Sequence, residues 1–294
     1  MATLKKRLER LTELRALPAV LTKLLSILGD ENATADDIAR VIVHDQALCV
    51  AILRAANSAA FGVRETTTSL DAAVMRLGFA ELRKLVMAHQ AALLFDQPTD
   101  GYGLDANDAW EGAVAGAFAA DRIGRAAGHE DPATCFTAAL LRDCGKGAAE
   151  ALVGSERIAS ALLGTGADET SGARSSAGSA EDNERRALGF CHAEVGAALA
   201  EIWDLPSPLV EAIRFHHTPP PDNETALIDI VHCADSVATQ LGYGVGLDGL
   251  EYPFDSAAHE RAGLAPEAVH AILVDVWSDL AECKANLLGN HRAA

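Results

Sequence analysis

Aromatic residues are scarce in this 294-residue sequence, where Phe, Trp and Tyr together make up 5%. Hydrophobic residues nevertheless reach 49% and are led by Ala and Leu. Ala and Leu favour helices, whereas aromatic and β-branched residues favour strands. No convincing run of alternating polar and apolar residues is present. The composition therefore predicts an all-α protein, long enough to bury a substantial core.

Long hydrophobic runs are also missing. The longest apolar run falls far short of the roughly 20 residues that span a bilayer. The first residues, "MATLKKRLERLTELRALP", are charged and amphipathic and lack the apolar segment of a secretory signal. We therefore expect no membrane insertion and a cytoplasmic location.

Positive charge is in short supply, with 24 Lys and Arg against 42 Asp and Glu and a net charge of −18. A nucleic-acid backbone attracts surfaces rich in Lys and Arg. This balance predicts that nucleic acid is not a partner.

The sequence has six cysteines and no Cys-x-x-Cys pair. Nothing in their spacing indicates a zinc ribbon or a dithiol redox site. Most lie among apolar neighbours, so we expect reduced thiols that pack as small hydrophobic residues.

Apolar residues recur at steps of three and four nearly everywhere, which is the pattern of amphipathic helices. Thr34, with acidic residues after it, is a plausible helix cap, and Asn57 is expected to end a helix and bend the chain. The predicted helices cover 19–28, 32–45, 45–58, 69–78, 79–95, 109–128, 132–146, 148–164, 184–203, 207–217, 225–242 and 266–289.

Three histidines stand near predicted helix ends, with acidic residues nearby. They are His192, His216 and His217, and the carboxylates are Asp143 and Asp235. A divalent-metal hydrolase needs several such ligands, converging from different helices, to position a metal-bound water. Spacing alone does not separate this cluster from structural histidines held by hydrogen bonds, so both interpretations stay open.

Several motifs occur together in one order and resemble the HDOD domain, the HD-related output domain of bacterial signalling proteins. They are "LPAVLTKLLSIL" (17–28), "DQALCVAILRAANSAAFG" (45–62), "TSLDAAVMRLGFAELRKLV" (68–86), "AALLRDCGK" (138–146), "ERRALGFCHAEVGAALAEIWDLPSPLVEAIRFHH" (184–217) and "IVHCADSVA" (230–238). The resemblance implies an HD-domain-like multi-helix bundle in two packed helical subregions.

The resemblance also sets the expected domain bounds. It covers about 12–242, as a helical half at about 12–95 and an HD-like half at about 105–242. Residues 165–183 have almost no large apolar side chain, which predicts a flexible loop within the second half. Residues 243–294 are expected to form a C-terminal helical extension.

Similarity to catalytic HD phosphohydrolases implies where metal ligands should stand. A first His is expected near the start of helix 109–128, where the closest position is Gly112. The adjacent His-Asp pair falls on Arg142 and Asp143, and the late aspartate matches Asp235. Arg142 stays protonated and repels a metal ion, but it can hold Asp143 and Asp235 through charge-assisted hydrogen bonds. The comparison thus predicts a degenerate HD site.

Three further histidines match those of the related HD-GYP phosphodiesterases approximately: His192, His216 and His217. The Gly-Tyr-Pro motif that names that group is absent after His217. Glu184 either orients His192 or belongs to a solvated helix N-terminus. These four residues are candidates for a residual ligand or polar cluster.

The resemblance implies a non-catalytic signalling or regulatory module that acts through protein contacts and needs no cofactor. We expect a stand-alone module whose protein partner is supplied in trans. One alternative is a metal-dependent phosphohydrolase, acting on a cyclic dinucleotide or nucleotide. Its rearranged site would use Asp143, His192, His216, His217 and Asp235. Another alternative is a nucleotide sensor without turnover.

Overall fold

The computed structural model describes residues 4–8, 17, 19–28, 33–43, 45–61, 66–164, 179–223, 225–249 and 255–288. Every regular element in these ranges is a helix, and the only pairing of extended backbone in them is an isolated bridge between Thr99 and Leu104. The predicted all-α class is therefore confirmed. Within the same ranges, no helix has the length and apolar character that crossing a bilayer requires.

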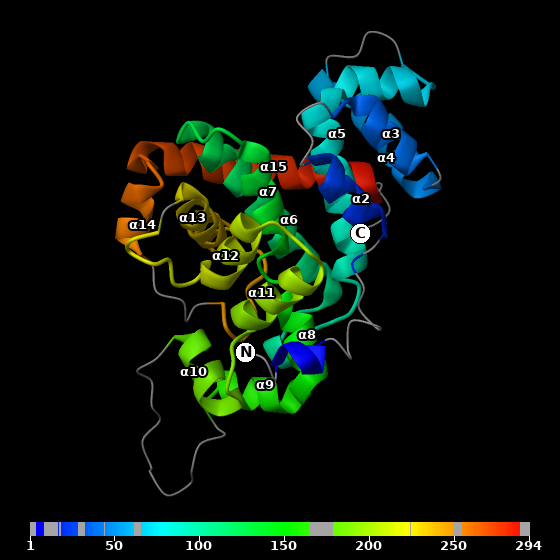
Figure 1. Cartoon of the computed structure of the whole chain (residues 1–294). Helices are drawn as coiled ribbons and strands as arrows, with labels where there is room; N and C mark the ends of the chain where they lie inside the picture. Colours follow the sequence, from blue (N-terminus) through cyan, green and yellow to red (C-terminus); the bar gives the residue numbers. More distant parts are fainter. Residues whose placement is uncertain are drawn as a thin grey trace, which may run out of the picture. The chain divides into compact units, whose positions relative to one another are not determined.

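The chain divides into two compact units, one of residues 1–16 and 95–277 and the other of residues 17–94 and 278–294. The smaller unit contains α2 (Ala19–Leu28), α3 (Ala35–Ile42), α4 (Gln46–Ala56), the short η1 (Ala59–Phe61) and α5 (Leu70–Leu94). Within it, α3 and α4 pack against α5 (Figure 1).

Local chemistry explains the helix boundaries in the smaller unit. The Asp45 carboxylate accepts a hydrogen bond from the Leu48 backbone N–H at 2.9 Å, which caps α4. Gly78 interrupts α5 with φ 72°, a left-handed conformation that glycine adopts at little cost. It divides the helix where the sequence predicts one helix to end and the next to begin.

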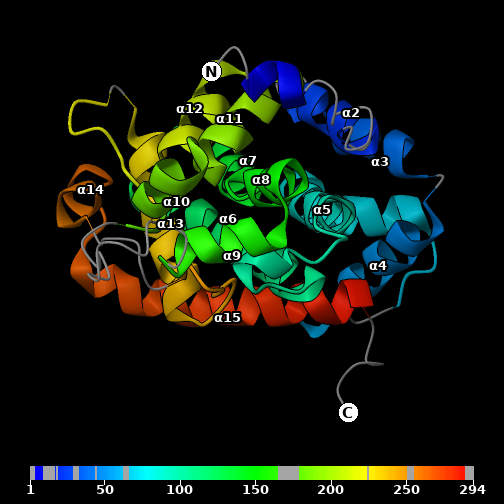
Figure 2. The same ribbon diagram turned by 90° about the horizontal axis from the view of Figure 1, so that it is seen from below.

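The larger unit carries the candidate site. Its helices are η2 (Asp100–Tyr102), α6 (Ala106–Ala126), α7 (Pro132–Leu141), α8 (Gly145–Val153), α9 (Ser155–Leu162), α10 (Ala180–Leu188), α11 (His192–Ile202), α12 (Ser207–Phe215), α13 (Ala226–Gln240), α14 (Ser256–Arg261) and the first part of α15 (Pro266–Leu288). The central helix α6 packs against α7 and α13, and α11 packs against α8 and α12 (Figure 2).

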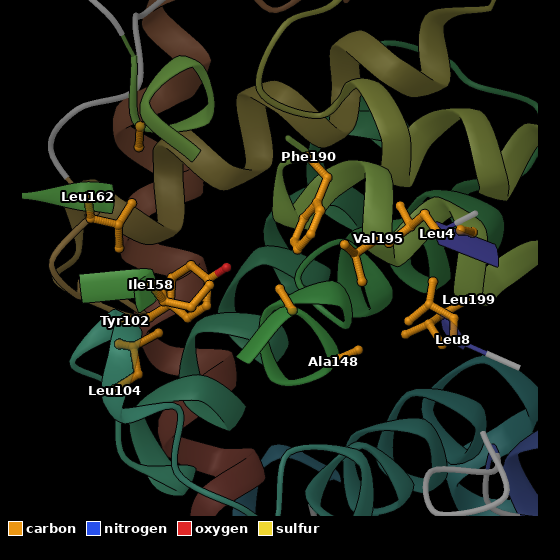
Figure 3. Packing of buried hydrophobic residues seen from close by; sticks show 13 residues of the cluster. Leu4, Leu8, Tyr102, Leu104, Ala148, Ile158, Leu162, Phe190, Val195 and Leu199 are labelled. Atoms are coloured by element: carbon orange, nitrogen blue, oxygen red, sulfur yellow. The ribbon is translucent and has the colours of Figure 1, made fainter. Parts of the chain in front are cut away.

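One hydrophobic cluster of this unit joins its first residues to η2, α8, α9 and α11 (Figure 3). Leu4 and Leu8, on the helical segment 4–8, lie beside Leu199 of α11, as Figure 3 shows. Tyr102 is fully buried in the same cluster near Ile158. The apolar packing fixes the Tyr102 ring, so the direction of its hydroxyl group is set as well.

The helices expected over 148–164 and 184–203 are each two helices in the structure. Gly154 (φ 87°) ends α8, and Gly189 (φ 83°) ends α10. Apolar periodicity continues through both breaks, which is why the pattern did not reveal them. The helix expected over 132–146 also ends earlier, at Leu141.

The flexible loop predicted over 165–183 is wrong at its C-terminal end. Ser179 caps α10 by accepting a hydrogen bond from the Asp182 N–H, and residues 180–183 are helical. A serine followed by acidic residues is a helix-start signal, which the low apolar content of the stretch concealed. Residues 165–178 lie outside the described residues.

The segment predicted as a C-terminal helical extension, 243–294, is divided between the two compact units. Residues 243–277 belong to the larger unit and residues 278–294 to the smaller one. Helix α14 was not predicted, and Arg261 at its end donates to both carboxylate oxygens of buried Asp229 in α13, at 2.7 and 3.1 Å. This pairing ties the segment to the predicted core.

Candidate functional site

The predicted site residues converge in the larger unit. Arg142 and Asp143 form the turn between α7 and α8, while His192 begins α11. His216 and His217 directly follow α12, and Asp235 lies in α13. Helix ends and turns supply most of these side chains, and the packing of α11 against α8 and α12 brings them together.

Arg142 is buried, and each of its three guanidinium nitrogens has a hydrogen-bond partner. Its Nε donates to Asp235 Oδ1 at 2.7 Å and lies 3.3 Å from Asp143 Oδ2. The two terminal nitrogens donate to backbone carbonyls, Nη1 to Ala139 at 2.9 Å and Nη2 to Gly112 at 3.0 Å. Burial by itself lowers the pKa of Arg142, but Asp235 and Asp143 more than offset it, so the pKa is raised. The predicted contacts of this guanidinium with both aspartates are present.

Two glycines of α6 shape the space around Arg142. A Cβ atom at Gly116 would overlap Nη1 of the guanidinium. A Cβ atom at Gly112 would lie 2.6 Å from the Cα of Gly244, whose φ of +68° is itself left-handed. Backbone therefore fills the place where an HD phosphohydrolase is expected to carry its first His, and no side chain fits at Gly112.

Asp143 faces two cations and two imidazoles. Its Oδ1 lies 3.1 Å from Lys146 Nζ, 3.7 Å from His192 Nε2 and 3.9 Å from His216 Nε2. Burial by itself raises the pKa of Asp143, but Lys146 and Arg142 more than offset it and hold that pKa well below its usual range. Asp143 is therefore an anion around which the site is arranged.

Lys146 links Asp143 to a residue that the sequence did not single out. Its Nζ lies 3.0 Å from Oδ2 of Asp248, which is fully buried, and 5.6 Å from the centre of the Tyr102 ring. Asp248 stands in a Gly-rich turn far along the chain, so its only sequence signal was an acidic residue between glycines. Lys146 thus holds two anions at the edge of the site.

Glu184 contacts both the backbone and the ring of His192. The Glu184 Oε2 atom accepts from the His192 backbone N–H at 3.1 Å and lies 2.8 Å from His192 Nδ1. Its Oε1 accepts from the Tyr102 hydroxyl at 2.6 Å. Both Glu184 and His192 are fully buried. Burial lowers the pKa of His192, but Glu184 more than offsets this effect, so the pKa is raised.

The adjacent His216 and His217 use different partners. His216 Nδ1 lies 2.8 Å from the Ile213 carbonyl, and its backbone carbonyl accepts from His232 Nδ1 at 2.8 Å. His217 Nδ1 lies 3.4 Å from Asp235 Oδ2. Burial lowers the pKa of His216 and lowers that of His217 well below its usual value.

Four donor atoms share one small space. One donor atom from each of Asp143, His192, His216 and His217 lies within 4.8 Å of the others. Three imidazoles and one carboxylate are a donor set that suits a divalent first-row ion, so these residues fit a metal. Asp235, which the sequence grouped with them, instead pairs with Arg142 and with His217.

The sequence thus identified most of the site but not all of it. It predicted the convergence of Asp143, Glu184 and the three histidines. It missed Tyr102, which contacts Glu184, His232, which contacts the His216 carbonyl, and Asp248, which pairs with Lys146. It also missed Gly116, which leaves room for the Arg142 guanidinium, and Gly244, whose backbone leaves no room for a side chain at Gly112. His232 stands three residues before Asp235 in the motif quoted above, but nothing in that motif indicates its contact with His216.

Comparison with known proteins agrees with this architecture. The family model for the HDOD domain matches residues 14–219. A curated protein of Treponema pallidum (strain Nichols), itself uncharacterized, is 27% identical over 230 residues, which are 77% of this chain. This chain spans 42% of the length of that relative.

Solved structures share the fold at low sequence identity. An HDOD domain protein of unknown function from Geobacter sulfurreducens superposes with a TM-score of 0.69 at 22% identity, covering 97% of both chains. A candidate signal transduction protein from Marinobacter aquaeolei VT8 gives 0.66 at 21% identity, covering 96% of this chain and 61% of that one. A candidate phosphohydrolase from Shewanella amazonensis SB2B gives 0.62 at 23% identity, covering 96% and 97%.

Proposed function

The chain belongs to the HDOD domain family, and we propose that it is a signalling module that acts through protein contacts and does not hydrolyse phosphate esters. The HDOD fold and the likeness to the Marinobacter aquaeolei protein support a role in signalling. The partner in this proposal is another protein of a signalling pathway.

The observation that carries the proposal is the placement of Arg142. Its guanidinium holds Asp235 and Asp143 at 2.7 and 3.3 Å, where a catalytic relative is expected to have a metal ligand. A cation at this distance repels a metal ion by several kcal/mol at an effective dielectric of about 20. The Gly244 backbone leaves no room for a side chain at Gly112, so the ligands expected at Gly112 and at Arg142 are both missing. The charge of the Asp143 carboxylate is already balanced by Arg142.

The proposal is tested by assaying purified full-length protein with Mn²⁺, Fe²⁺ or Mg²⁺ against cyclic dinucleotides and nucleoside phosphates. We expect no hydrolysis above a metal-only blank. Turnover that disappears in Asp143→Ala and persists in His270→Ala, which changes an exposed histidine of α15, would overturn it.

A second candidate is the rearranged metal-dependent phosphohydrolase. It is favoured by the four neighbouring donor atoms of Asp143, His192, His216 and His217, because a metal held there would supply a bound water as nucleophile. Such an enzyme also needs an open coordination position and access for a phosphate ester. The same assay separates the two candidates, since only the hydrolase releases product.

A further inference from the structure

We propose that a groove between α3 and the beginning of α5 binds an amphipathic helix of a partner protein, with apolar residues on one face of that helix and Lys or Arg beside them. The groove has a volume of about 580 Å³. All of its lining residues belong to the smaller unit, whereas the candidate site lies in the larger one. The inference rests on the proposed function, because it names the surface through which such a module contacts another protein.

Helix α3 carries more apolar surface than its own packing uses. Ile38 and Ile42 are fully buried, on the side where α3 packs within the smaller unit (Figure 1). Ala39 and Val43 each stand one position further along, about 100° around the helix, and line the groove. Val43 is 50% exposed. One apolar face is enough to hold a helix on its unit, so this second face is left for a contact outside the chain.

Helix α5 contributes an exposed methionine to the same groove. Met75 is 75% exposed, whereas Met87 of the same helix is fully buried in the core. Met75 and Leu70 line the groove from α5. A methionine side chain is flexible and polarisable, which suits a surface that adapts to a partner. Large apolar side chains exposed together on two neighbouring helices are typical of an interaction surface.

The exposure of the lining residues favours a helix over a small molecule. Sites for small molecules bury about 70–90% of their ligand, which requires enclosing walls. Val43 and Met75 are at least half exposed, so the groove is open and shallow. An amphipathic helix covers such a groove with apolar side chains at steps of three and four residues.

The charges beside the groove specify a basic partner. Asp36 and Asp71 lie in the first turns of α3 and α5, are exposed and line the groove. In the part of the chain that the structure describes, neither carboxylate pairs with a cation. The cation of the groove, Arg40, is balanced by Asp37 at 2.7 Å. The remaining negative charge complements Lys and Arg, and it disfavours a second copy of this chain, whose net charge is −18.

The experiment is a selection on the immobilised full chain from a displayed library of random peptides of about 16 residues, long enough for about four helical turns. We expect enriched peptides to combine Lys or Arg with apolar residues at steps of three and four. No enrichment, or enriched peptides without positive charge, overturns the proposal. Self-association of the protein that Met75→Gln abolishes places a second copy in the groove, which also overturns it.

Matched variants locate the peptide, and fluorescence anisotropy of a synthetic enriched peptide measures its affinity. The double variant Val43→Thr and Met75→Gln should lower affinity at least about tenfold, because it removes apolar surface that the peptide buries. Val50→Thr is the control, since Val50 is 46% exposed in the same unit and does not line the groove. Peptides that bind the folded double variant as well as wild type place the contact elsewhere. That outcome overturns the groove and leaves the signalling proposal standing.

A second pair of variants tests the charges. Asp36→Asn combined with Asp71→Asn should lower affinity about threefold in about 50 mM salt and hardly at all in about 500 mM salt, where screening is strong. Asp96→Asn combined with Asp100→Asn removes the same charge from exposed positions of the larger unit and should change nothing. Equal losses in the two pairs overturn the charge complementarity. Hydrolysis in the assay above would overturn the proposed function without altering these binding results.

Discussion

Arg142 donates its Nε–H to Asp235 Oδ1 at 2.7 Å, which joins the α7–α8 turn to the middle of α13. The same side chain donates to the carbonyl of Gly112 in α6. A residue that stands where relatives are expected to place a metal ligand is therefore a structural cross-link between three elements. The guanidinium supplies the positive charge that Asp235 and Asp143 share.

Removing this cross-link should destabilise the protein strongly. Arg142→Ala leaves the largely buried Asp235 and Asp143 without their shared cation, and breaking a buried pair in this way costs about 3–5 kcal/mol. Arg122→Ala is the control, because its pair with Asp275 is partly exposed and is worth at most about 1 kcal/mol. Chemical denaturation of both variants gives the comparison. Equal, small losses would show that Arg142 is not a cross-link.

Gly112 should tolerate no side chain. Gly112→Ala places a Cβ atom 2.6 Å from the Gly244 backbone, which cannot rotate away, so we expect a net loss of about 1–3 kcal/mol. In Gly124→Ala, on the same helix, the new Cβ lies 3.1 Å from the Cys135 sulfur, which can shift. That control should change stability by less than about 1 kcal/mol. Thermal melts of the two variants suffice, and a Gly112→Ala protein as stable as wild type would contradict the close packing.

Asn57 should stabilise the smaller unit through its side-chain amide. Its Nδ2 donates to the Thr67 carbonyl and its Oδ1 accepts from the Thr67 N–H, both at 2.9 Å, at the C-terminal cap of α4. Asn57→Ala removes both bonds and should cost about 1–3 kcal/mol. Ser26→Ala, which loses one exposed bond to Lys23, should stay within about 0.5 kcal/mol. A loss no larger than that of Ser26→Ala would assign Asn57 no structural role.

The cysteines should be unreactive in the native protein. All six are free thiols, and burial, with nearby carboxylates, raises the pKa of Cys135, Cys233 and Cys283 to about 12. A raised pKa means a smaller thiolate fraction at a given pH, and the thiolate is the reactive form. At pH 8 a thiol reagent should modify Cys49, which is only half-buried, well before the others. All six should react at once in denaturant. Rapid modification of every thiol in buffer alone would be inconsistent with this core.

Local patterns made much of the fold predictable. The helices follow from apolar residues at steps of three and four, and the division of α5 follows from Gly78. The pattern failed where it continued through a break, as at Gly154 and Gly189, because periodicity measures which side chains are apolar and not which backbone turns left-handed. Helix α14 was too short, at six residues, to show a periodic signal.

Most residues of the candidate site, and one of its ion pairs, were predictable from the sequence. Motifs named Asp143, Glu184, His192, His216 and His217, because ligand chemistry is a property of residue type. The comparison with HD phosphohydrolases also gave the pairing of Arg142 with Asp143 and Asp235, which the structure contains. The motifs could not show that Lys146 would pair with Asp248, since these residues come together only in the folded chain. Nor could they show that Gly244 closes Gly112, a contact between distant backbones.

The sequence by itself determined the all-α class, the HDOD family and the identity of the charged and imidazole groups that meet in the core. Tertiary structure alone decided which nitrogen of each histidine faces inward, because that depends on the partners of Nδ1: Glu184, Ile213 and Asp235. It also decided that the guanidinium of Arg142 and the rings of His192 and His216 face the same carboxylate, that of Asp143. The chemistry of each residue is given by its type, which the sequence states. Distances of a few ångströms between residues far apart in the chain arise only when the helices pack.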